Sequence, residues 1–426
     1  MIERRPVVVV RPAGPQDVAE TIRFAKENGL PLAVRGGGHN VAGAALADRG
    51  VTIDMSQKRG VSVDPDRLLV RVEPGATWKE VDAATQPHGL VVPSGIISAT
   101  GVAGFTLGAG FGWTSRKLGF AADNLVSAEV VTADAKIRRA SIAEEPDLFW
   151  ALRGGSGNFG VVTEFEFRAH RHGPEVAAGI VIHPFERARD LIRLYREVTA
   201  EAPDELTCLL ILRKALPAPN IPAEHHGKLI AAIMAHWTGD PADGVAAMQP
   251  LKAFGDPIVD NIGPKPFTAF QTALDGGQPF GRRYYWKSAE VDAVSDGLIE
   301  ALEENAARII SPFSAILMMH MGGAPSRVPP EATAVGIRAA RFGVVTQGAW
   351  EKPEDDAREI AWVRGAYAAT RAFGSERAYV NFLTDDETRT RIDEAYGQEL
   401  FERLRRIKGK YDPGNLFSGN LNIPPA

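Results

Sequence analysis

Glycine is concentrated in three short segments between residues 35 and 160, and this limits the possible folds more than any other feature. The segments are "RGGGHN" (35–40), "SGIISATGVAGFTLGAGFGW" (94–113) and "GSGNFG" (155–160). A glycine-rich segment exposes successive backbone N–H groups and lets the main chain approach a flat or anionic ligand. Close packing of short strands explains any one of these segments. Three of them in one half of the chain favour a ligand-binding site.

The third segment has the Gly-x-Gly-x-x-Gly spacing of a dinucleotide-binding motif, but its neighbours stand in the reverse order. That motif requires a strand, then the glycine turn, then a helix whose N-terminus holds the pyrophosphate. Here the helix-like "PDLFWALR" precedes the glycines and the strand-like "VVTEFEF" follows them. The P-loop pattern Gly-x-x-x-x-Gly-Lys-Ser/Thr does not occur in the sequence. A Rossmann site and a P-loop site are therefore both disfavoured.

Size and charge indicate an ordinary globular protein of two domains. The 426 residues exceed what a single core normally holds. The net charge of −5 argues against a nucleic-acid partner, and the sequence shows neither a membrane span nor a signal peptide. The single cysteine, Cys208, lies in the strand-like "LTCLLIL", which predicts an inert core thiol and excludes an internal disulfide. We expect a cytoplasmic protein that binds neither nucleic acid nor membrane.

The order of predicted elements is that of an α+β protein. Up to residue 172, short strands alternate with short helices; one helix starts at Pro15, and Thr77 and Glu80 open another as a capping box. Longer strands and amphipathic helices follow, in a pattern that favours a largely antiparallel sheet with helices on one face. From about residue 385 the chain is helical again. It ends in the irregular "YDPGNLFSGNLNIPP", which we expect to dock on a polar surface.

His39 stands out because it directly follows three consecutive glycines. A metal site is disfavoured, since no second histidine, cysteine or carboxylate lies at ligand spacing, and His225, His226 and His320 are isolated from it and from other ligands. A hydrogen-bonded structural histidine is one interpretation. The other is an imidazole that acts as a nucleophile or covalent anchor, with the glycines making room for a large planar partner.

Four segments, in order along nearly the whole chain, resemble those of bacterial berberine-bridge-enzyme-like FAD-linked oxidases, which have the vanillyl-alcohol-oxidase (PCMH-type) fold. The segments are "PLAVRGGGHNVAG", "PSGIISATGVAGFTLGAGFGWTSRKLGFAADNLV", "DLFWALRGGSGNFGVVTEFEF" and "YDPGNLFSGNLNIPP". The resemblance implies a PCMH-type FAD-binding domain over residues 1–172, an inserted substrate domain over 173–384, and a C-terminal return to the first domain over 385–426. It also implies that Met1 falls some way into the fold of many relatives, so that a preceding segment is expected to be absent.

The same resemblance implies roles for individual residues. His39 is expected to bond the 8α-methyl carbon of the flavin ring. Doubly anchored family members have a cysteine where this sequence has Ile97, so a single covalent bond is expected. Thr100 is expected beside the flavin edge that oxygen reaches, where a small β-branched residue goes with oxidase behaviour. The further FAD-binding residues implied are Arg35, Gly36, Gly37, Gly38, Asn40, Gly43, Gly101, Gly104, Gly108, Gly110, Asn124, Gly157, Gly160, Val162, Asn420 and Asn422.

The catalytic base is marked far less clearly than the cofactor site. We expect Tyr379, in a strand "RAYVNFL", to be the base, which requires a nearby cation or hydrogen-bond donor to lower its pKa. Gln347 is a weaker candidate for orienting substrate. The alternatives are a hydrogen-bonded strand tyrosine and a glutamine facing a sheet edge. The run 284–286, "YYW", fits either a substrate cleft or ordinary sheet packing.

The predicted function is that of an FAD-dependent enzyme that takes a hydride from a small secondary alcohol or amine, with oxygen as acceptor. Sugars, alkaloids and polyketide-type molecules are the substrate classes that the resemblance implies. Two alternatives stay open: a flavin dehydrogenase or tailoring oxygenase on the same scaffold, and a flavin-carrying binding protein without turnover. The oligomeric state is not predicted.

Overall fold

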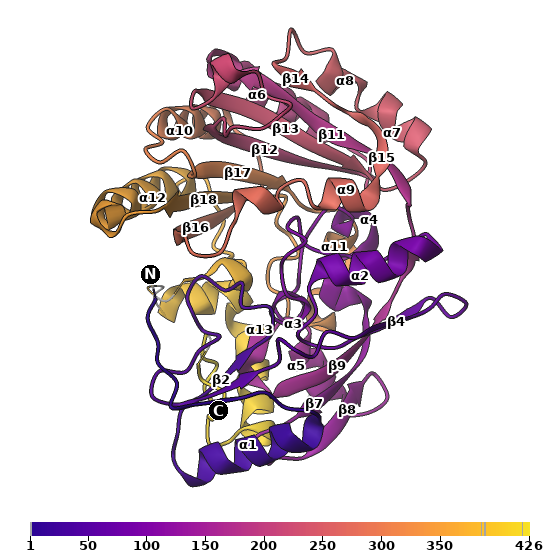
Figure 1. Ribbon diagram of the computed structural model, residues 1–426, viewed down its shortest axis with the longest axis vertical. Coiled ribbons are helices and arrows are strands. Elements are labelled where there is room, and N and C mark those ends of the chain that lie inside the picture. Colours follow the sequence, from indigo (N-terminus) through magenta and orange to yellow (C-terminus); the bar gives the residue numbers. More distant parts are fainter. Residues whose placement is uncertain (1, 385, 387–388, 420) are drawn as a thin grey trace.

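The computed structural model of the protein describes residues 2–384, 386, 389–419 and 421–426. The chain forms two lobes, which lie one above the other in Figure 1. The N-terminal lobe contains strands β1 to β10, helix α13 and the C-terminal tail, and the sheet lobe contains the elements from β11 to α12. Helices and sheets are mixed in both lobes, which confirms the predicted α+β class.

The N-terminal lobe is built on two sheets of short strands. A parallel sheet has the order β1-β3-β2, an antiparallel sheet has the order β4-β5-β9-β7-β8, and β6 pairs with β10. The strands are β1 (Val8–Val10), β2 (Leu32–Arg35), β3 (Val51–Asp54), β4 (Val61–Asp64), β5 (Leu69–Val72), β6 (Leu90–Val91), β7 (Leu125–Val131), β8 (Ile137–Ser141), β9 (Val161–Arg168) and β10 (His170–Arg171). The helices are α1 (Pro15–Glu27), α2 (Trp78–Thr85), α3 (Val102–Leu107), α4 (Ser115–Leu118), α5 (Pro146–Leu152) and α13 (Arg389–Tyr411).

Local signals account for several of these elements. Pro15 is the first residue of α1, which buries Val18 and Ile22 as the helical spacing predicts. At the start of α2, the backbone N–H of Thr77 donates a 2.7 Å hydrogen bond to Glu80 Oε2, as expected of a capping box. Helix α5 precedes the third glycine segment and β9 follows it. The order is therefore the reverse of a Rossmann motif, as predicted.

The sheet lobe contains one large antiparallel sheet among the described residues. Its order is β14-β11-β13-β12-β17-β18-β16, and β15 also pairs with β11. The strands are β11 (Glu175–Pro184), β12 (Leu206–Lys214), β13 (Leu229–Trp237), β14 (Val259–Asp260), β15 (Gly263–Pro266), β16 (Arg283–Val291), β17 (Ala315–His320) and β18 (Phe342–Trp350). The helices are α6 (Ala188–Ala200), α7 (Pro241–Ala247), α8 (Gln249–Lys252), α9 (Phe267–Gln271), α10 (Asp296–Ala306), α11 (Ala324–Arg327) and α12 (Asp356–Arg371).

The two faces of this sheet have different neighbours. Alternate residues of β12, among them Cys208 and Leu210, pack in one core with Leu191 of α6, Leu298 of α10 and Val363 of α12. The intervening residues of the same strand belong to a second core, which includes side chains of the N-terminal lobe. The helices α6, α10 and α12 thus cover one face of an antiparallel sheet, as predicted, and the other face is turned toward the N-terminal lobe (Figure 1).

The prediction of a strand around Tyr379 is wrong. Tyr379 directly precedes a 3₁₀ turn at Val380–Phe382, and the segment has no strand partner among the described residues. The side chain of Asn381 donates hydrogen bonds to the backbone carbonyls of Phe105 and Gly108, so this segment is held by the glycine-rich segment of the N-terminal lobe. Ala378 already packs in the core of that lobe, ahead of residue 385.

The C-terminal tail docks on the third glycine segment. Asn158 Nδ2 donates to the carbonyl of Leu421 at 3.1 Å, and Asn158 Oδ1 accepts from the backbone N–H of Ile423 at 3.1 Å. Lys408, fully buried, donates to Asp412 Oδ2 at 2.6 Å and to the carbonyl of Phe417 at 2.9 Å. Docking on a polar surface was predicted, and the polar partner is the amide of Asn158.

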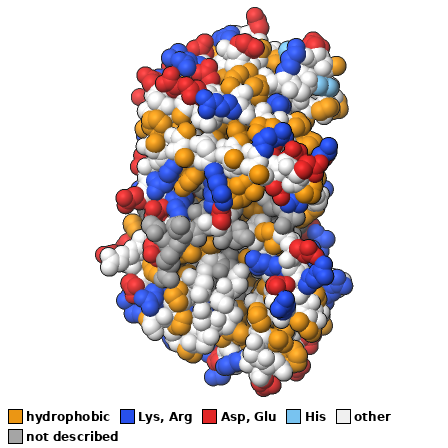
Figure 2. Space-filling model, turned by 90° about the vertical axis from the view of Figure 1, so that its left-hand side faces the viewer, with side chains coloured by type: hydrophobic (Ala, Val, Ile, Leu, Met, Phe, Trp, Pro, Cys, Tyr) orange, Lys and Arg blue, Asp and Glu red, His pale blue; other side chains and the backbone are white. Residues whose placement is uncertain are grey.

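Charged side chains of both signs are interspersed with apolar ones on the face of the molecule that Figure 2 shows. That face carries no broad area of a single charge. In the part of the chain that the structure describes, no helix combines the length and the apolar character needed to cross a bilayer.

Candidate functional site

A cavity lies between the N-terminal lobe and the inner face of the large sheet. All three glycine-rich segments contribute to its lining, together with β12, β16, β17, β18 and the segment 379–382. The predicted site residues that line it are Gly36, Gly37, Gly38, His39, Asn40, Thr100, Gly101, Gly104, Gly157, Gly160, Val162, Gln347 and Tyr379. Segments that are far apart in the sequence therefore surround a single space.

The loop after β2 is held against the second glycine segment by direct backbone packing. A Cβ on Gly37 would lie 2.5 Å from the Cα of Gly101, and a Cβ on Gly101 would lie 2.6 Å from the Cα of Gly37. Only two glycines allow the backbones to approach this closely. Gly38 has φ +68°, a conformation that favours glycine, and it turns the chain so that His39 follows at the cavity wall.

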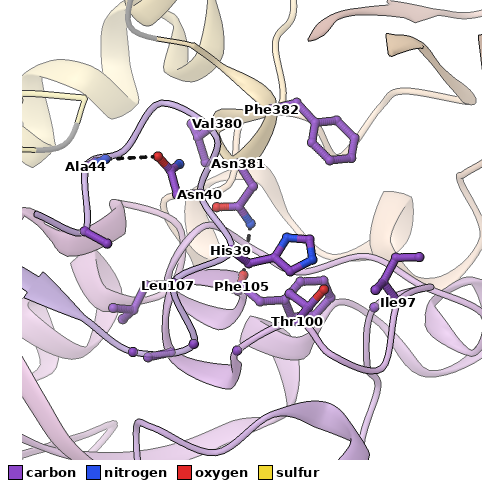
Figure 3. A pocket seen from close by; sticks show the side chains of 18 of the residues that line it. His39, Asn40, Ala44, Ile97, Thr100, Phe105, Leu107, Val380, Asn381 and Phe382 are labelled. Atoms are coloured by element: carbon purple, nitrogen blue, oxygen red, sulfur yellow. Dashed lines mark hydrogen bonds between the residues drawn. The ribbon is translucent and has the colours of Figure 1, made fainter. Parts of the chain in front are cut away.

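His39 projects from this loop into the cavity. In Figure 3 its ring lies above Thr100, with Ile97 to the right and Phe382 above the ring. Burial lowers the pKa of His39, and the negative charge of Asp275 opposes that shift only in part. The imidazole is therefore neutral at pH 7 and has a nitrogen lone pair available, the form that a nucleophile or covalent anchor requires.

Asp275 is itself positioned by the second glycine segment. Its Oδ1 accepts from the backbone N–H of Ser98 at 2.9 Å, and its Oδ2 accepts from Ser98 Oγ at 2.6 Å. These two bonds join the sheet lobe to the segment that carries Ile97 and Thr100. Sequence reasoning missed Asp275 because its partner Ser98 is 177 positions away in the chain.

The second glycine segment supplies one wall of the cavity. The short helix α3 lies within this segment and contains Gly104. A Cβ built on Gly104 would have no atom within 4 Å. A side chain at residue 104 would enter the cavity. Ile97 and Thr100 also line the space, and the described lining holds no thiol. Cys208 is buried in β12 on the opposite face of the sheet, where burial raises its pKa to about 12, as expected of an inert core thiol.

The third glycine segment supplies another part of the cavity lining. Nothing lies within 4 Å of a Cβ built on Gly157, whereas one on Gly160 would lie 2.6 Å from the carbonyl oxygen of Val131. Gly157 therefore leaves room in the cavity, and Gly160 with φ +147° lets β9 start close to β7. In the adjoining tail, the buried Oδ1 of Asn422 has no hydrogen-bond partner. The predicted Asn420 lies outside the described residues.

Two of the residues predicted to bind FAD, Arg35 and Gly43, support the loop after β2 from outside the cavity. Arg35 Nη1 pairs with Asp54 Oδ2 at 3.5 Å, and its guanidinium lies behind Gly38, whose Cβ would be 3.1 Å from Arg35 Nε. Gly43 has φ +70° and donates its N–H to the carbonyl of Asn40, which closes a turn. Both act on the shape of the loop in this structure.

Three other predicted residues also lie outside the lining. A Cβ on Gly108 would lie 2.1 Å from Asn381 Oδ1, and one on Gly110 would lie 2.4 Å from the Phe105 ring, so both positions need glycine for packing. Asn124 Nδ2 donates to two backbone carbonyls at 2.9 Å, and its Oδ1 lies 2.6 Å from His170 Nε2. These contacts are internal to the N-terminal lobe.

Tyr379 lines the cavity, but its electrostatics differ from the expectation. Burial raises its pKa to about 12, and the hydrogen bonds from Asn381 and from the backbone of Phe111 and Gly110 offset this shift only in part. The phenol is therefore protonated at pH 7. The expected lowering of its pKa does not occur, because the nearby donors are neutral and the side chain is almost fully enclosed.

Gln347 lies in the interior of the sheet and not at an edge, since β18 is paired on both sides. Its Oε1 accepts a 2.7 Å hydrogen bond from Gln278 Nε2, and both side chains line the cavity. Of the aromatic run 284–286, only Trp286 lines the cavity, while Tyr285 packs on the helical side of the sheet. The cleft interpretation therefore holds for Trp286 and the sheet-packing interpretation holds for Tyr285.

The site has the properties that a large, flat and anionic cofactor requires. Two glycines of the lining, Gly104 and Gly157, leave open space beside the backbone. His39 projects into the same cavity in its neutral form. Among the described residues, no group of three or more His, Cys, Asp or Glu side chains is placed to hold a metal ion. These residues fit FAD.

Comparisons with known proteins agree with this geometry. Residues 6–141 match an FAD binding domain family, and residues 378–424 match the berberine and berberine-like family. An FAD-linked oxidoreductase of Dictyostelium discoideum is 29% identical over 99% of this chain and 89% of its own. The (R)-6-hydroxynicotine oxidase of Paenarthrobacter nicotinovorans is 28% identical over 99% of this chain and 92% of its own.

The fold is shared with solved structures as well. The crystal structure of 6-hydroxy-D-nicotine oxidase from Arthrobacter nicotinovorans aligns with a TM-score of 0.88 at 24% identity, covering 100% of this chain and 93% of that chain. The two family matches cover parts of the chain that line the same cavity from opposite ends of the sequence. The chain is therefore an FAD-linked oxidoreductase, and over nearly its whole length it is similar to the berberine-bridge-enzyme-like proteins.

Proposed function

We propose that the protein holds FAD through a single covalent bond to His39 and oxidises a small secondary alcohol or amine with dioxygen as electron acceptor. The observation that carries the proposal is the neutral His39 imidazole, which projects into a cavity walled by three glycine-rich segments. Ile97 in the same lining supports one bond rather than two. The related (R)-6-hydroxynicotine oxidase is named for an amine substrate, which supports the amine part of this substrate class.

Bound FAD supplies the group that accepts a hydride from the substrate carbon. The substrate loses two electrons and two protons, and dioxygen takes them up as hydrogen peroxide. The protein must then orient the substrate and accept the proton of the hydroxyl or amino group. Gln347 and Trp286 present a polar amide and an aromatic face on the sheet side of the cavity, where they can orient it. Within the described lining no carboxylate is present, so Tyr379 is the remaining candidate for the proton acceptor.

We expect the oxidation of an alcohol substrate to accelerate strongly as the pH rises. The proton acceptor is the phenolate of Tyr379, which is scarce below its pKa of about 12 and increases with pH. The value of kcat/KM should rise about tenfold per pH unit between about pH 7 and 9. Tyr379→Phe should abolish this slope, and the control Tyr195→Phe, which removes a buried hydroxyl bonded to the Met318 carbonyl, should keep it. A wild-type profile that is flat over this range would rule out Tyr379 as the base.

A substrate screen tests the proposed function directly. The purified protein is mixed without oxygen with sugars, alkaloids and phenolic alcohols, and the visible absorbance of the flavin is followed. Bleaching by a member of the panel and recovery in air with formation of peroxide are expected. Bleaching without recovery in air would indicate a dehydrogenase, and a product that contains oxygen from air would indicate an oxygenase. Absence of bleaching across amines and alcohols would favour a binding protein.

Thr100 is expected to control the reaction with oxygen. Its side chain lines the cavity near His39, and a leucine there would extend further into that space (Figure 3). Thr100→Leu should slow flavin reoxidation at least about tenfold, a barrier increase of about 1.4 kcal/mol, while reduction by substrate stays nearly unchanged. Thr100→Val, which keeps the size, is the control. Stopped-flow mixing of reduced protein with oxygenated buffer measures the rate, and equal rates in wild type and Thr100→Leu would contradict the assignment.

A further inference from the structure

Arg213 is a charged side chain on the sheet side of the cavity. It follows Leu209 and Ile211 on the inner face of β12, and all three line the cavity. Its Nε and Nη2 are buried and have no hydrogen-bond partner. A buried guanidinium whose N–H groups are unsatisfied costs free energy unless a ligand or ordered water meets them.

The surroundings of Arg213 contain no compensating charge. The described cavity lining holds no aspartate or glutamate, and Arg213 is its one arginine or lysine. The charge that shifts the pKa of Arg213 is that of another cation, Arg282, which is itself paired with Glu351 and stacked on Phe313. Burial, and then the charge of Arg282, lower the pKa of Arg213 to about 10, so it still carries its charge at pH 7.

The sheet register places Arg213 in a row with two other cavity residues. Arg213 pairs with Ala315, Ala315 pairs with Gln347, and Gln347 pairs with Trp286 across β12, β17, β18 and β16. Directly paired residues point to the same face of a sheet. The small Ala315 side chain leaves space between the guanidinium of Arg213 and the Gln347 amide. This row therefore presents a cation, an amide and an aromatic ring along one line.

The next rows of the same face are apolar. Ile211 pairs with Leu317, and Leu317 pairs with Val345; all three line the cavity. A ligand on this face thus meets a hydrocarbon surface along its length and the positive charge at one end. An arginine fork matches the geometry of a carboxylate, which accepts two parallel N–H bonds.

We propose that Arg213 binds a carboxylate of the substrate, so that the oxidised alcohol or amine is part of an apolar or aromatic carboxylic acid. This proposal rests on the proposed function, because it assigns the substrate class of the same cavity. Gln347 and Trp286 flank the apolar body of that acid, and Arg213 determines its direction in the cavity. Neutral alcohols such as sugars lack the group that Arg213 would bind.

Binding of matched acids and amides tests the proposal. Mandelate carries an aromatic ring, a secondary alcohol and a carboxylate, and mandelamide replaces the carboxylate with a neutral amide of similar size. Benzoate and benzamide form a second pair that lacks the oxidisable alcohol. Isothermal titration calorimetry of the purified flavin-containing protein, without oxygen, measures both affinities. Wild type should bind each acid at least about tenfold more tightly than its amide, as expected for charge-assisted hydrogen bonds.

Variants locate the effect at Arg213. Arg213→Met should weaken binding of mandelate about 10- to 100-fold and change that of mandelamide less than about threefold. Arg213→Lys should retain part of the preference, because it keeps the charge but loses the fork. The matched control is Lys214→Met, which removes the neighbouring cation of β12, a side chain bonded to the Ile310 carbonyl outside the cavity. It should leave both affinities unchanged.

Three results would overturn the proposal. The wild-type protein could bind neither acid more tightly than its matched amide, and this result would refute the proposal even if a variant fails to fold. Arg213→Met could weaken acid and amide equally, which would indicate a packing role. It could also shift the flavin spectrum or potential without altering the preference, which would place Arg213 on the cofactor. A preparation without flavin, or one that no alcohol or amine reduces, contradicts the proposed function instead, while calorimetry still reports whether the acid is preferred.

Discussion

His39→Ala is expected to convert a flavin that stays with the denatured protein into one that is released completely. In the wild-type protein the imidazole is neutral and projects into the cavity, so its nitrogen can carry a covalent bond. The glycine-rich walls and the tail are unchanged in the variant, so FAD should still bind, but reversibly. Because His39 is only partly buried and His39→Ala removes no core packing, the free energy of unfolding should change by no more than about 1 kcal/mol.

Acid precipitation followed by digestion measures this result. In wild type, all flavin should be in the pellet and a single histidyl-flavin peptide containing His39 should be found. In His39→Ala all flavin should be in the supernatant, and substrate oxidation should be slower. The control His88→Ala removes an exposed histidine at the end of a 3₁₀ turn and should retain the flavin. Two outcomes contradict the assignment: a freely released wild-type flavin, and an attachment at a second residue. A variant that cannot fold would show instead that His39 is mainly structural.

Gly37→Ala and Gly104→Ala are expected to affect the protein in different ways, although both glycines line the cavity. The added methyl group at residue 37 would lie 2.5 Å from the Cα and 2.8 Å from the N of Gly101, and neither backbone atom can move away without shifting the loop. Such overpacking should reduce the free energy of unfolding by about 1–3 kcal/mol or more. Displacing the loop should also displace His39 and reduce covalent flavin.

The methyl group at residue 104 meets nothing within 4 Å, and alanine favours the helix α3 by about 0.5–1 kcal/mol over glycine. Stability of the protein chain should therefore be kept or improved, while the flavin content decreases because the methyl group occupies cavity space. Denaturant unfolding and the visible flavin absorbance per protein separate the two effects. Full flavin content in Gly104→Ala would show that residue 104 does not face the cofactor. Wild-type stability in Gly37→Ala would show that the two loops are not in backbone contact.

The local part of this fold can be predicted from the chain itself. Pro15 and the Thr77–Glu80 pair start their helices through bonds within a few residues, so neighbouring sequence is sufficient. The continuous, mainly apolar run "LTCLLIL" assigns Cys208 to a buried strand for the same reason. The glycine segments and His39 are also visible in sequence, because glycine has a backbone role that no other residue can take.

Long-range contacts decided the rest of the site. Tyr379 lies in a segment without a strand partner because Asn381 bonds to the carbonyls of Phe105 and Gly108, more than 270 positions away. Its pKa of about 12 follows from enclosure by both lobes, which no local pattern of residues expresses. Asn124 and Arg35 have the residue types of ligand-binding groups, yet in this structure their partners are His170 and Asp54.

Arg213 shows most clearly the difference between what local sequence predicts and what long-range contacts decide. In the sequence it is an arginine near the end of an apolar strand, which normally reaches solvent or an acidic partner. Its actual surroundings depend on the register of four strands and on the lobe that covers them. The described lining of the cavity around Arg213 contains no carboxylate. The sequence by itself determined where the backbone needs glycine and where strands and helices begin. Tertiary structure decided which polar groups are left without partners, because desolvation and pairing depend on residues brought together from the whole chain.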